Sequence, residues 1–135
     1  MTGFLIDTNV LLDLVTNDPV WAGWSRDAVV RAARGGHLLI NPVIYAELSV
    51  AFDTVEALDG TLERVSIFSA PIPPPALFLA GRVFRQYRRQ RGSRTGVLPD
   101  FFVGAHAAVE RLTLITRDTR RRAWFPTVEV VSPLQ

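Results

Sequence analysis

The stretch from Phe4 to Leu12 constrains the fold more strongly than any other part of the chain. A short apolar run, Phe4–Ile6, ends at the carboxylate of Asp7. A small polar pair then leads into apolar residues at helical spacing, a pattern typical of a buried parallel strand followed by a helix. In open α/β folds the carboxyl ends of the strands form the edge where ligands bind. We therefore expect Asp7 to stand at a functional edge of a sheet.

The rest of the chain alternates between short apolar runs and amphipathic stretches with cap and stop signals. This alternation predicts an α/β fold in which a mostly parallel sheet is covered by helices on both faces. At 135 residues, we expect one domain spanning 1–135. The expected strands are 4–6, 38–40, 70–72, 112–116 and 128–131, and the expected helices are about 8–16, 18–34, 41–52, 54–68, 76–91 and 100–111.

Composition excludes several classes of site. The chain has no cysteine, so thiol catalysis, disulfides and cysteine-liganded zinc are excluded. No apolar stretch approaches the roughly 20 residues that cross a bilayer, and no leader pattern opens the chain. We therefore expect a soluble, cytoplasmic protein without a membrane partner. All 15 basic residues are arginines, many of them within 82–94 and 117–122. These clusters indicate either a surface that binds nucleic-acid phosphates or solvated helix faces without a binding role.

Four acids stand at the starts or ends of the expected elements: Asp7, Glu47, Asp100 and Asp118. Parallel strands present their carboxyl ends at one edge, where the following helices begin, so these residues can converge in one cleft. Carboxylates gathered there would repel one another unless a cation compensates them. An all-oxygen site without thiolate suits Mg²⁺ or Mn²⁺. Metal-assisted hydrolysis of a phosphodiester is the chemistry that such a site favours.

Each of these acids also has a purely structural interpretation. Asp7 and Asp100 are good helix caps, Glu47 is compatible with an exposed helix position, and Asp118 with a turn. His106 lies among alanines within an expected helix, which favours a structural role. The three tryptophans, Trp21, Trp24 and Trp124, are interpreted as packing residues rather than as platforms for bases.

The chain resembles the PIN-domain ribonucleases, and among them the VapC-type toxins of toxin–antitoxin systems. The resemblance runs the whole chain. It rests on the stretches Leu5–Leu12, Tyr45–Leu48, Leu98–Ala107, Leu114–Asp118 and Phe125–Val128.

The resemblance implies a three-layer α/β/α sandwich and a Mg²⁺- or Mn²⁺-dependent endoribonuclease. It assigns the catalytic, metal-binding acids to Asp7, Glu47, Asp100 and Asp118 and makes Asn9 and Thr116 orienting residues. It also implies an RNA substrate, a homodimer and a cognate antitoxin whose C-terminal segment fills the cleft. The chain departs from the pattern after Asp118. There Thr119 and the arginines 120–122 stand where relatives often offer another acid, which leaves a water-mediated contact of Asp118 with the metal open.

Two alternatives differ in class. Phosphoryl transfer through an aspartyl intermediate would need a second aspartate two residues after Asp7, and Asn9 occupies that place. A non-catalytic RNA-binding or scaffolding module with a PIN-like fold would not need the four acids. Cleavage of RNA with Mg²⁺ or Mn²⁺, repeated in a chelator, separates these possibilities.

Overall fold

The central sheet has five parallel strands in the order β3-β2-β1-β4-β5. This computed structural model describes residues 2–90, 92 and 96–133. The first strand lies in the middle of the sheet, and the later strands are added on its two sides. The strands are β1 (Thr2–Ile6), β2 (Gly36–Ile40), β3 (Ile67–Ser69), β4 (Thr113–Ile115) and β5 (Val130–Val131).

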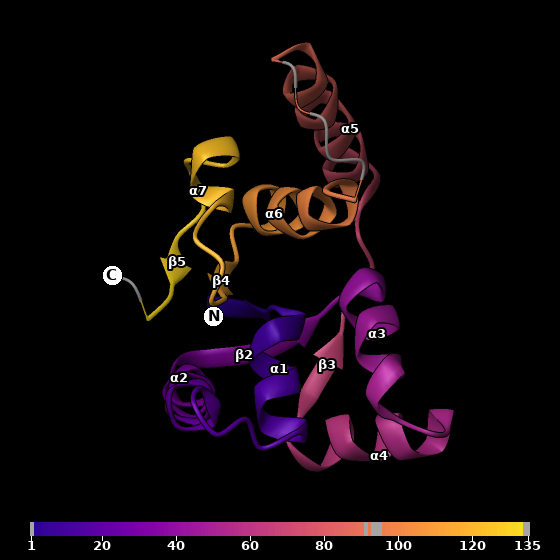
Figure 1. The fold of residues 1–135 in the computed structure, drawn as a ribbon, viewed down its shortest axis with the longest axis vertical. Coiled ribbons are helices and arrows are strands. Elements are labelled where there is room, and N and C mark those ends of the chain that lie inside the picture. The colour runs from indigo at the N-terminus through magenta and orange to yellow at the C-terminus, as the bar shows by residue number, and fades with distance from the viewer. Residues whose placement is uncertain (1, 91, 93–95, 134–135) are drawn as a thin grey trace.

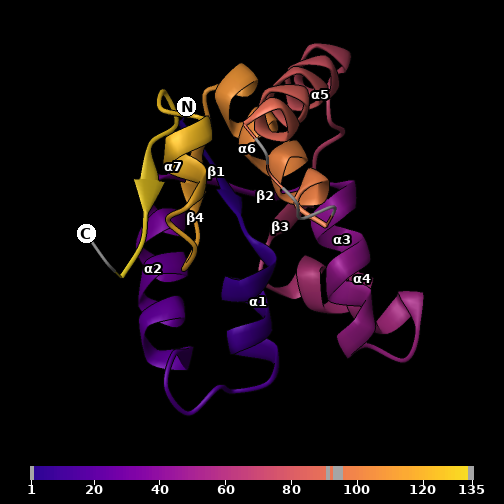
Figure 2. The same ribbon diagram turned by 45° about the horizontal axis from the view of Figure 1, so that its top comes forward.

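Helices cover both faces of this sheet, which confirms the three-layer α/β/α fold. Figures 1 and 2 show α1 and α2 on one side of the strands and α5 and α6 on the other. Among the described residues, no helix is long and apolar enough to cross a membrane. The helices are α1 (Thr8–Val15), α2 (Ala22–Gly35), α3 (Pro42–Leu48), the short 3₁₀ turn η1 (Ser49–Ala51), α4 (Val55–Arg64), α5 (Pro74–Arg89), α6 (Leu98–Glu110) and α7 (Arg121–Trp124).

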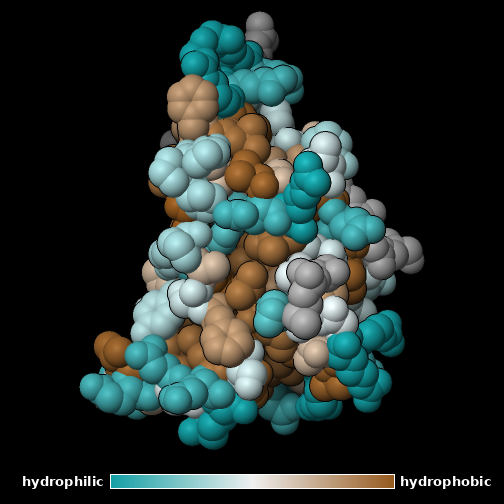
Figure 3. All heavy atoms as spheres, turned by 180° about the vertical axis from the view of Figure 1, so that it is seen from behind, coloured by the Kyte–Doolittle hydropathy of each residue, from teal (hydrophilic) through white to brown (hydrophobic). Residues whose placement is uncertain are grey.

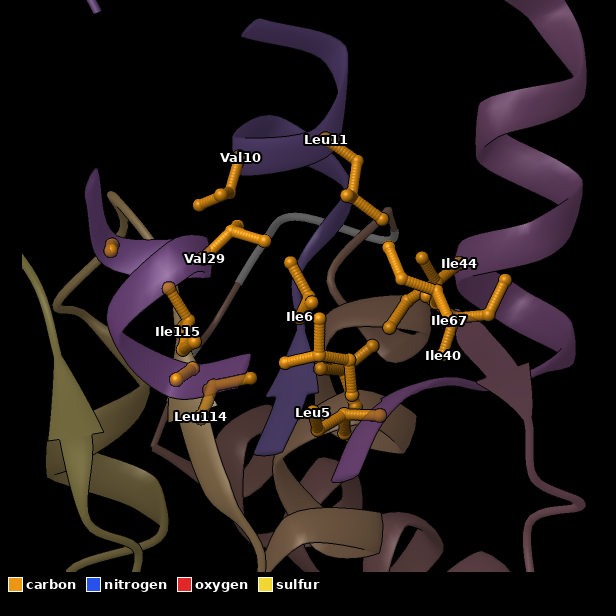
Figure 4. Packing of buried hydrophobic residues seen from close by; sticks show 14 of the residues in the cluster. Leu5, Ile6, Val10, Leu11, Val29, Ile40, Ile44, Ile67, Leu114 and Ile115 are labelled. Atoms are coloured by element: carbon orange, nitrogen blue, oxygen red, sulfur yellow. The ribbon is translucent and has the colours of Figure 1, made fainter. Parts of the chain in front are cut away.

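The core surrounds β1. Leu5 and Ile6 are fully buried, and helical side chains such as Val10 and Ile44 close around them (Figure 4). A strand buried on both faces carries a continuous apolar run rather than an alternating one, which is why Phe4–Ile6 was recognisable in the sequence. This packing fixes the end of β1, and with it the position of the next residue, Asp7.

The register between β1 and β4 brings two later residues to the same edge. Ile6 pairs with Ile115, and the backbone N–H of Asp7 donates to the Ile115 carbonyl at 2.9 Å. Asp7 and Thr116 therefore leave the sheet side by side, although 109 residues separate them.

Several local expectations were wrong, among them the helix over 54–68, which ends at Arg64. The edge strand β3 is Ile67–Ser69 rather than 70–72. Pro71 lies within the expected segment and Pro73 follows it, so the pairing continues only as far as Ala70, whose N–H donates to the Ile40 carbonyl at 2.8 Å. The second helix begins at Ala22, because Asp18 caps the preceding turn.

The buried face of α3 is not the one that residue spacing alone indicates. Val43, Ala46 and Val50 stand at the three- and four-residue spacing of one helix face, but the helix buries Ile44 and Leu48 instead. Val50 lies in η1, where the change of helix type rotates it outward, and it is 88% exposed.

Candidate active site

The carboxylate of Asp7 is buried at the end of β1 and is held by three donors. It caps α1 by accepting from the Thr8 N–H at 2.9 Å. Its other oxygen accepts from the Thr116 hydroxyl at 2.7 Å and from the Asn9 amide at 3.3 Å. The capping interpretation of Asp7 is thus correct. It does not exclude a functional role, because the second carboxylate oxygen faces Thr116 at the end of the neighbouring strand β4.

The side chain of Thr116 links the carboxyl ends of β1 and β4 by hydrogen bonds. Its hydroxyl donates to Asp7 and accepts from the Asn9 amide at 3.3 Å and from the Asp118 N–H at 3.0 Å. One hydroxyl has one donor and two acceptor sites, so these three bonds saturate it. The loop that carries Asp118 is therefore tied directly to the residue that orients Asp7.

Glu47 reaches the same edge from α3. Asn41 sets this helix in place, because its side-chain oxygen accepts from the Ile44 N–H at 3.0 Å and Pro42 follows as the first helical residue. The Glu47 side chain is exposed, and one oxygen accepts from the Thr8 hydroxyl at 2.6 Å. Thr8 thus lies between the carboxylates of Asp7 and Glu47.

Asp100 and Asp118 face one cavity of about 120 Å³. Asp100 lies in the first turn of α6, and the N-cap position belongs to Val97, so the expectation that Asp100 caps the helix was wrong. Asp118 lies in the loop after β4. The structure therefore brings Asp100 and Asp118 to one hollow, and Asp7 to the base of the Asp118 loop through Thr116.

Asp118 is engaged by a neighbouring arginine. The Arg120 guanidinium donates two bonds to its carboxylate, from Nε at 3.0 Å and from Nη2 at 2.7 Å. This pairing raises the pKa of Arg120, with a smaller contribution from the charge of Asp100. A cation is thus already present at the acidic cavity, supplied by the arginine run that follows Asp118.

The donor chemistry of the four acids fits a hard divalent cation, since all of them offer carboxylate oxygens. Their arrangement is less compact than the sequence suggested. Within the described ranges, no three acidic or histidine side chains gather closely enough to hold a metal ion. The assignment of Asp7, Glu47, Asp100 and Asp118 as metal ligands therefore stays a prediction.

A part-buried ion pair between α1 and the residue after Thr116 also lies near this edge, and the sequence analysis missed it. Asp13 on α1 is almost fully buried and receives two bonds from the Arg117 guanidinium, at 2.8 and 3.1 Å. Ser25 donates to the same carboxylate at 2.7 Å, and the guanidinium lies 5.1 Å from the Trp21 ring centroid. Nothing in the sequence marks Asp13, because it is one polar residue within an apolar helix.

Arg117 consequently does not belong to an exposed basic rim. Its backbone N–H donates to Asn9 at 3.1 Å while its side chain turns inward to Asp13. On α5, by contrast, Arg82, Arg85 and the pair 88–89 are exposed, as a phosphate-gripping surface would require. Arg91 and Arg94, and the side chains of 121 and 122, lie outside the described residues.

His106 has a structural role, as its surroundings in the sequence suggested. It is buried, and its Nδ1 lies 3.1 Å from the Asn41 amide nitrogen. Because the Asn41 oxygen caps α3, the amide group must donate to Nδ1, which leaves the proton of the neutral ring on Nε2. Burial lowers the pKa of His106, and the charge of Glu110 opposes this shift.

Comparison with known proteins gives a consistent family. The model of the PIN domain matches residues 4–124. A chain of VapBC2 from Rickettsia felis, solved bound to a DNA fragment from their promoter, is similar with a TM-score of 0.74 and 15% identity, over 97% of this chain and 98% of that one. A chain of DNA-bound VapBC from Salmonella typhimurium is similar with a TM-score of 0.71 and 17% identity, over 98% of both chains.

A chain of a toxin–antitoxin complex from Klebsiella pneumoniae is similar at a higher identity. It gives 26% identity and a TM-score of 0.61 over 96% of both chains. No curated protein sequence matches the chain.

Proposed function

This chain belongs to the PIN-domain family, and from that premise we propose that it is a metal-dependent endoribonuclease acting as the toxin of a toxin–antitoxin pair. The observation that carries the proposal is the convergence of Asp7, Thr116 and Asp118 at one edge of the sheet. That edge adjoins the cavity that Asp100 shares with Asp118. Hydrolysis joins the oxygen of a water to phosphorus and breaks one ester P–O bond of the RNA.

We assign Mg²⁺ or Mn²⁺ to the oxygens of Asp7 and Asp100, with Glu47 and Asp118 completing the set. A bound divalent cation would supply Lewis-acid stabilisation of the charge that develops on the phosphoryl oxygens. The chain's own contribution is orientation. Thr116 and Asn9 hold the Asp7 carboxylate in one direction, as partners of a ligand commonly do, and Thr8 aligns Glu47.

The partner supported by the comparisons is a cognate antitoxin, since similar chains come from VapBC and toxin–antitoxin complexes. An apolar groove offers such a partner an anchor. It lies among α1, α2, α4 and neighbouring residues and is lined by Leu11, Leu14, Val15, Val29, Leu48, Phe52, Leu58, Thr61, Leu62, Val65 and Ile67. An antitoxin would bury the apolar face of one segment there, and its C-terminal segment would place a basic side chain over the acids.

A homodimer is also part of the proposal. Large apolar side chains are exposed outside the groove, notably Val50 (88%), Val20 (74%) and Phe68 (58%). Figure 3 shows apolar atoms running down the middle of the face opposite to that of Figure 1. An RNA substrate places the protein in the cytoplasm, and 1–135 is proposed to act as a single nuclease domain.

The decisive experiment replaces Asp100 with Asn. Asp100 is only half-buried, so this change removes a carboxylate charge with little effect on folding. Wild type should cleave RNA in the presence of Mg²⁺ or Mn²⁺, and a chelator should stop the cleavage. Asp100→Asn should cleave at least about a hundredfold more slowly than wild type. Asp59→Asn, an exposed acid on α4, is the matched control and should cleave at the wild-type rate. Cleavage by Asp100→Asn at that same rate would refute the assignment.

Asp7→Asn is a less clean test than Asp100→Asn. Its new amide would face the Thr116 hydroxyl, whose acceptor sites are already used by Asn9 and Asp118. We therefore expect Asp7→Asn to lose activity and also some stability, so its unfolding midpoint must be measured beside its activity.

A non-catalytic RNA-binding module is the second candidate. The observation that favours it is the bidentate engagement of Asp118 by Arg120, which neutralises one of the four acids. A wild-type protein that binds RNA tightly but cleaves none with either metal would establish this alternative.

A further inference from the structure

The cavity beside Asp100 and Asp118 has aromatic as well as acidic walls. Where one water takes about 10–15 Å³, its volume of about 120 Å³ has room for roughly ten water-sized atoms. That is the size of a nucleobase. Its lining comes from α5, α6, α7 and the loops beside them: Tyr87, Val97, Asp100, Phe101, Asp118, Arg120 and Trp124.

Three rings form the apolar part of this wall. The ring centroids of Tyr87 and Trp124 lie 5.7 Å apart with planes at 74°, and those of Tyr87 and Phe101 lie 5.7 Å apart at 80°. Phe101 is buried, whereas Tyr87 and Trp124 are half-buried and keep part of their ring surface accessible. The Tyr87 ring also stacks on Phe84, with ring centroids 6.2 Å apart and planes at 24°. A flat guest in the cavity would therefore contact the parts of the Tyr87 and Trp124 rings that remain accessible there.

The aromatic wall is held in place before any ligand arrives. The Gly92 N–H donates to the Tyr87 carbonyl at 3.0 Å, and the Tyr87 ring lies so close to Gly92 that any β-carbon there would collide with it. Phe101 packs against Phe125 on its other side, with ring centroids 5.9 Å apart. A ring fixed in this way loses little conformational freedom when a base stacks on it.

We propose that this cavity binds one unpaired nucleobase of the RNA, adjacent to the phosphate that is cleaved. The proposal rests on the proposed ribonuclease function, because Asp100 and Asp118 belong both to the cavity and to the assigned metal site. Aromatic side chains bind bases with little sequence preference, since every base has a π-face. A base inside a duplex has both faces covered, so the cavity selects single-stranded segments. Arg120, 66% exposed at the cavity, is placed to meet a neighbouring phosphate.

The test compares two short single-stranded RNAs of equal length and charge, one normal and one in which every nucleotide is abasic. Affinity is measured by fluorescence anisotropy in a chelator, so that no cleavage occurs. Stacking is worth about 1–3 kcal/mol per base, so we expect wild type to bind the abasic RNA about 5- to 150-fold more weakly. Equal affinity for the two RNAs would overturn the proposal without any need for a variant.

Variants then locate the effect. Trp124→Leu and Tyr87→Leu should bind normal RNA more weakly, and their affinity for abasic RNA should equal that of wild type. Most of the difference between the two affinities then disappears. Phe78→Leu, an exposed aromatic on the same helix as Tyr87 but outside the cavity, should keep the full wild-type difference. A difference that persists in both cavity variants would place base binding elsewhere and overturn the proposal. Tyr87→Leu answers the question if Trp124→Leu does not fold.

The outcomes separate this proposal from the function on which it rests. Cleavage with Mg²⁺ combined with equal affinity for normal and abasic RNA would refute the base site and leave the ribonuclease intact. A cavity-dependent preference for normal RNA without any cleavage would support the base site and refute the enzymatic function.

Discussion

At the scale of single residues, His106 connects pH to stability. Its buried ring accepts a hydrogen bond from Asn41, and that acceptor is lost when Nδ1 is protonated. Burial lowers the pKa of His106 in the folded state below its ordinary 6.5, so the unfolded chain binds the proton more readily. The contribution of His106 is complete above about pH 6.5 and declines as the pH falls from there toward its folded pKa.

This linkage is measurable by urea unfolding of wild type and His106→Leu across the pH range. The variant loses a buried hydrogen bond, so at pH 8 it should be less stable by about 1–2 kcal/mol. The difference between the two proteins should shrink as the pH falls below 6.5. His37→Leu, at an exposed position, controls for the loss of a histidine as such. A difference independent of pH would show that the ring is not held neutral.

At the scale of elements, a close approach between α6 and the segment after α7 depends on Gly104. A β-carbon at Gly104 would collide with the buried ring of Phe125. Ala normally stabilises a helix by about 1 kcal/mol relative to Gly, but overpacking a core costs about 1–3 kcal/mol. Gly104→Ala should therefore destabilise the protein.

Gly81→Ala is the matched control for this prediction. Gly81 lies within α5 with no atom near the place of a β-carbon, so alanine there should raise the free energy of unfolding by about 0.5–1 kcal/mol. The double variant Gly104→Ala/Phe125→Leu should recover part of the loss. Thermal unfolding of the four proteins decides the matter, and stabilisation by Gly104→Ala would contradict the packing of α6 against Phe125.

At the scale of the whole molecule, arginines are distributed on both sides of the sheet. Exposed Arg85, Arg88 and Arg89 lie on α5, near the cavity, and an equal number of exposed arginines lies on α2, on the opposite side. If the α5 group grips RNA, each phosphate contact contributes about 0.7 to the slope of log affinity against log salt for a single strand. Replacing the three by alanine should flatten that slope by about 2.

The α2 arginines provide a control of equal charge. Replacing Arg26, Arg31 and Arg34 together should leave the slope nearly unchanged, although it alters the net charge by the same amount. RNA affinity is measured at several salt concentrations for all three proteins. Equal slopes for the wild type and the α5 variant would assign those arginines to solvation.

The sequence by itself determined the features that follow from local patterns. The apolar run before Asp7 identified the central strand, because a strand buried on both faces needs continuous apolar residues. The expected start of the third helix at residue 41 was correct, because the cap of Asn41 and the preset φ angle of Pro42 act within one turn. The alternation of strands and helices was enough to predict the layered α/β fold.

Only the tertiary structure decided which distant groups meet. Thr116 saturates its hydroxyl with Asp7 at the end of β1, Asn9 on α1 and Asp118 in its own loop, and Asp13 pairs with a residue 104 positions away. The chain pattern could not reveal that Arg117 turns inward while Arg120 turns to Asp118, since both are arginines only three positions apart. Such choices depend on the balance between desolvation and pairing at each site, and the packed elements, not the local sequence, set that balance.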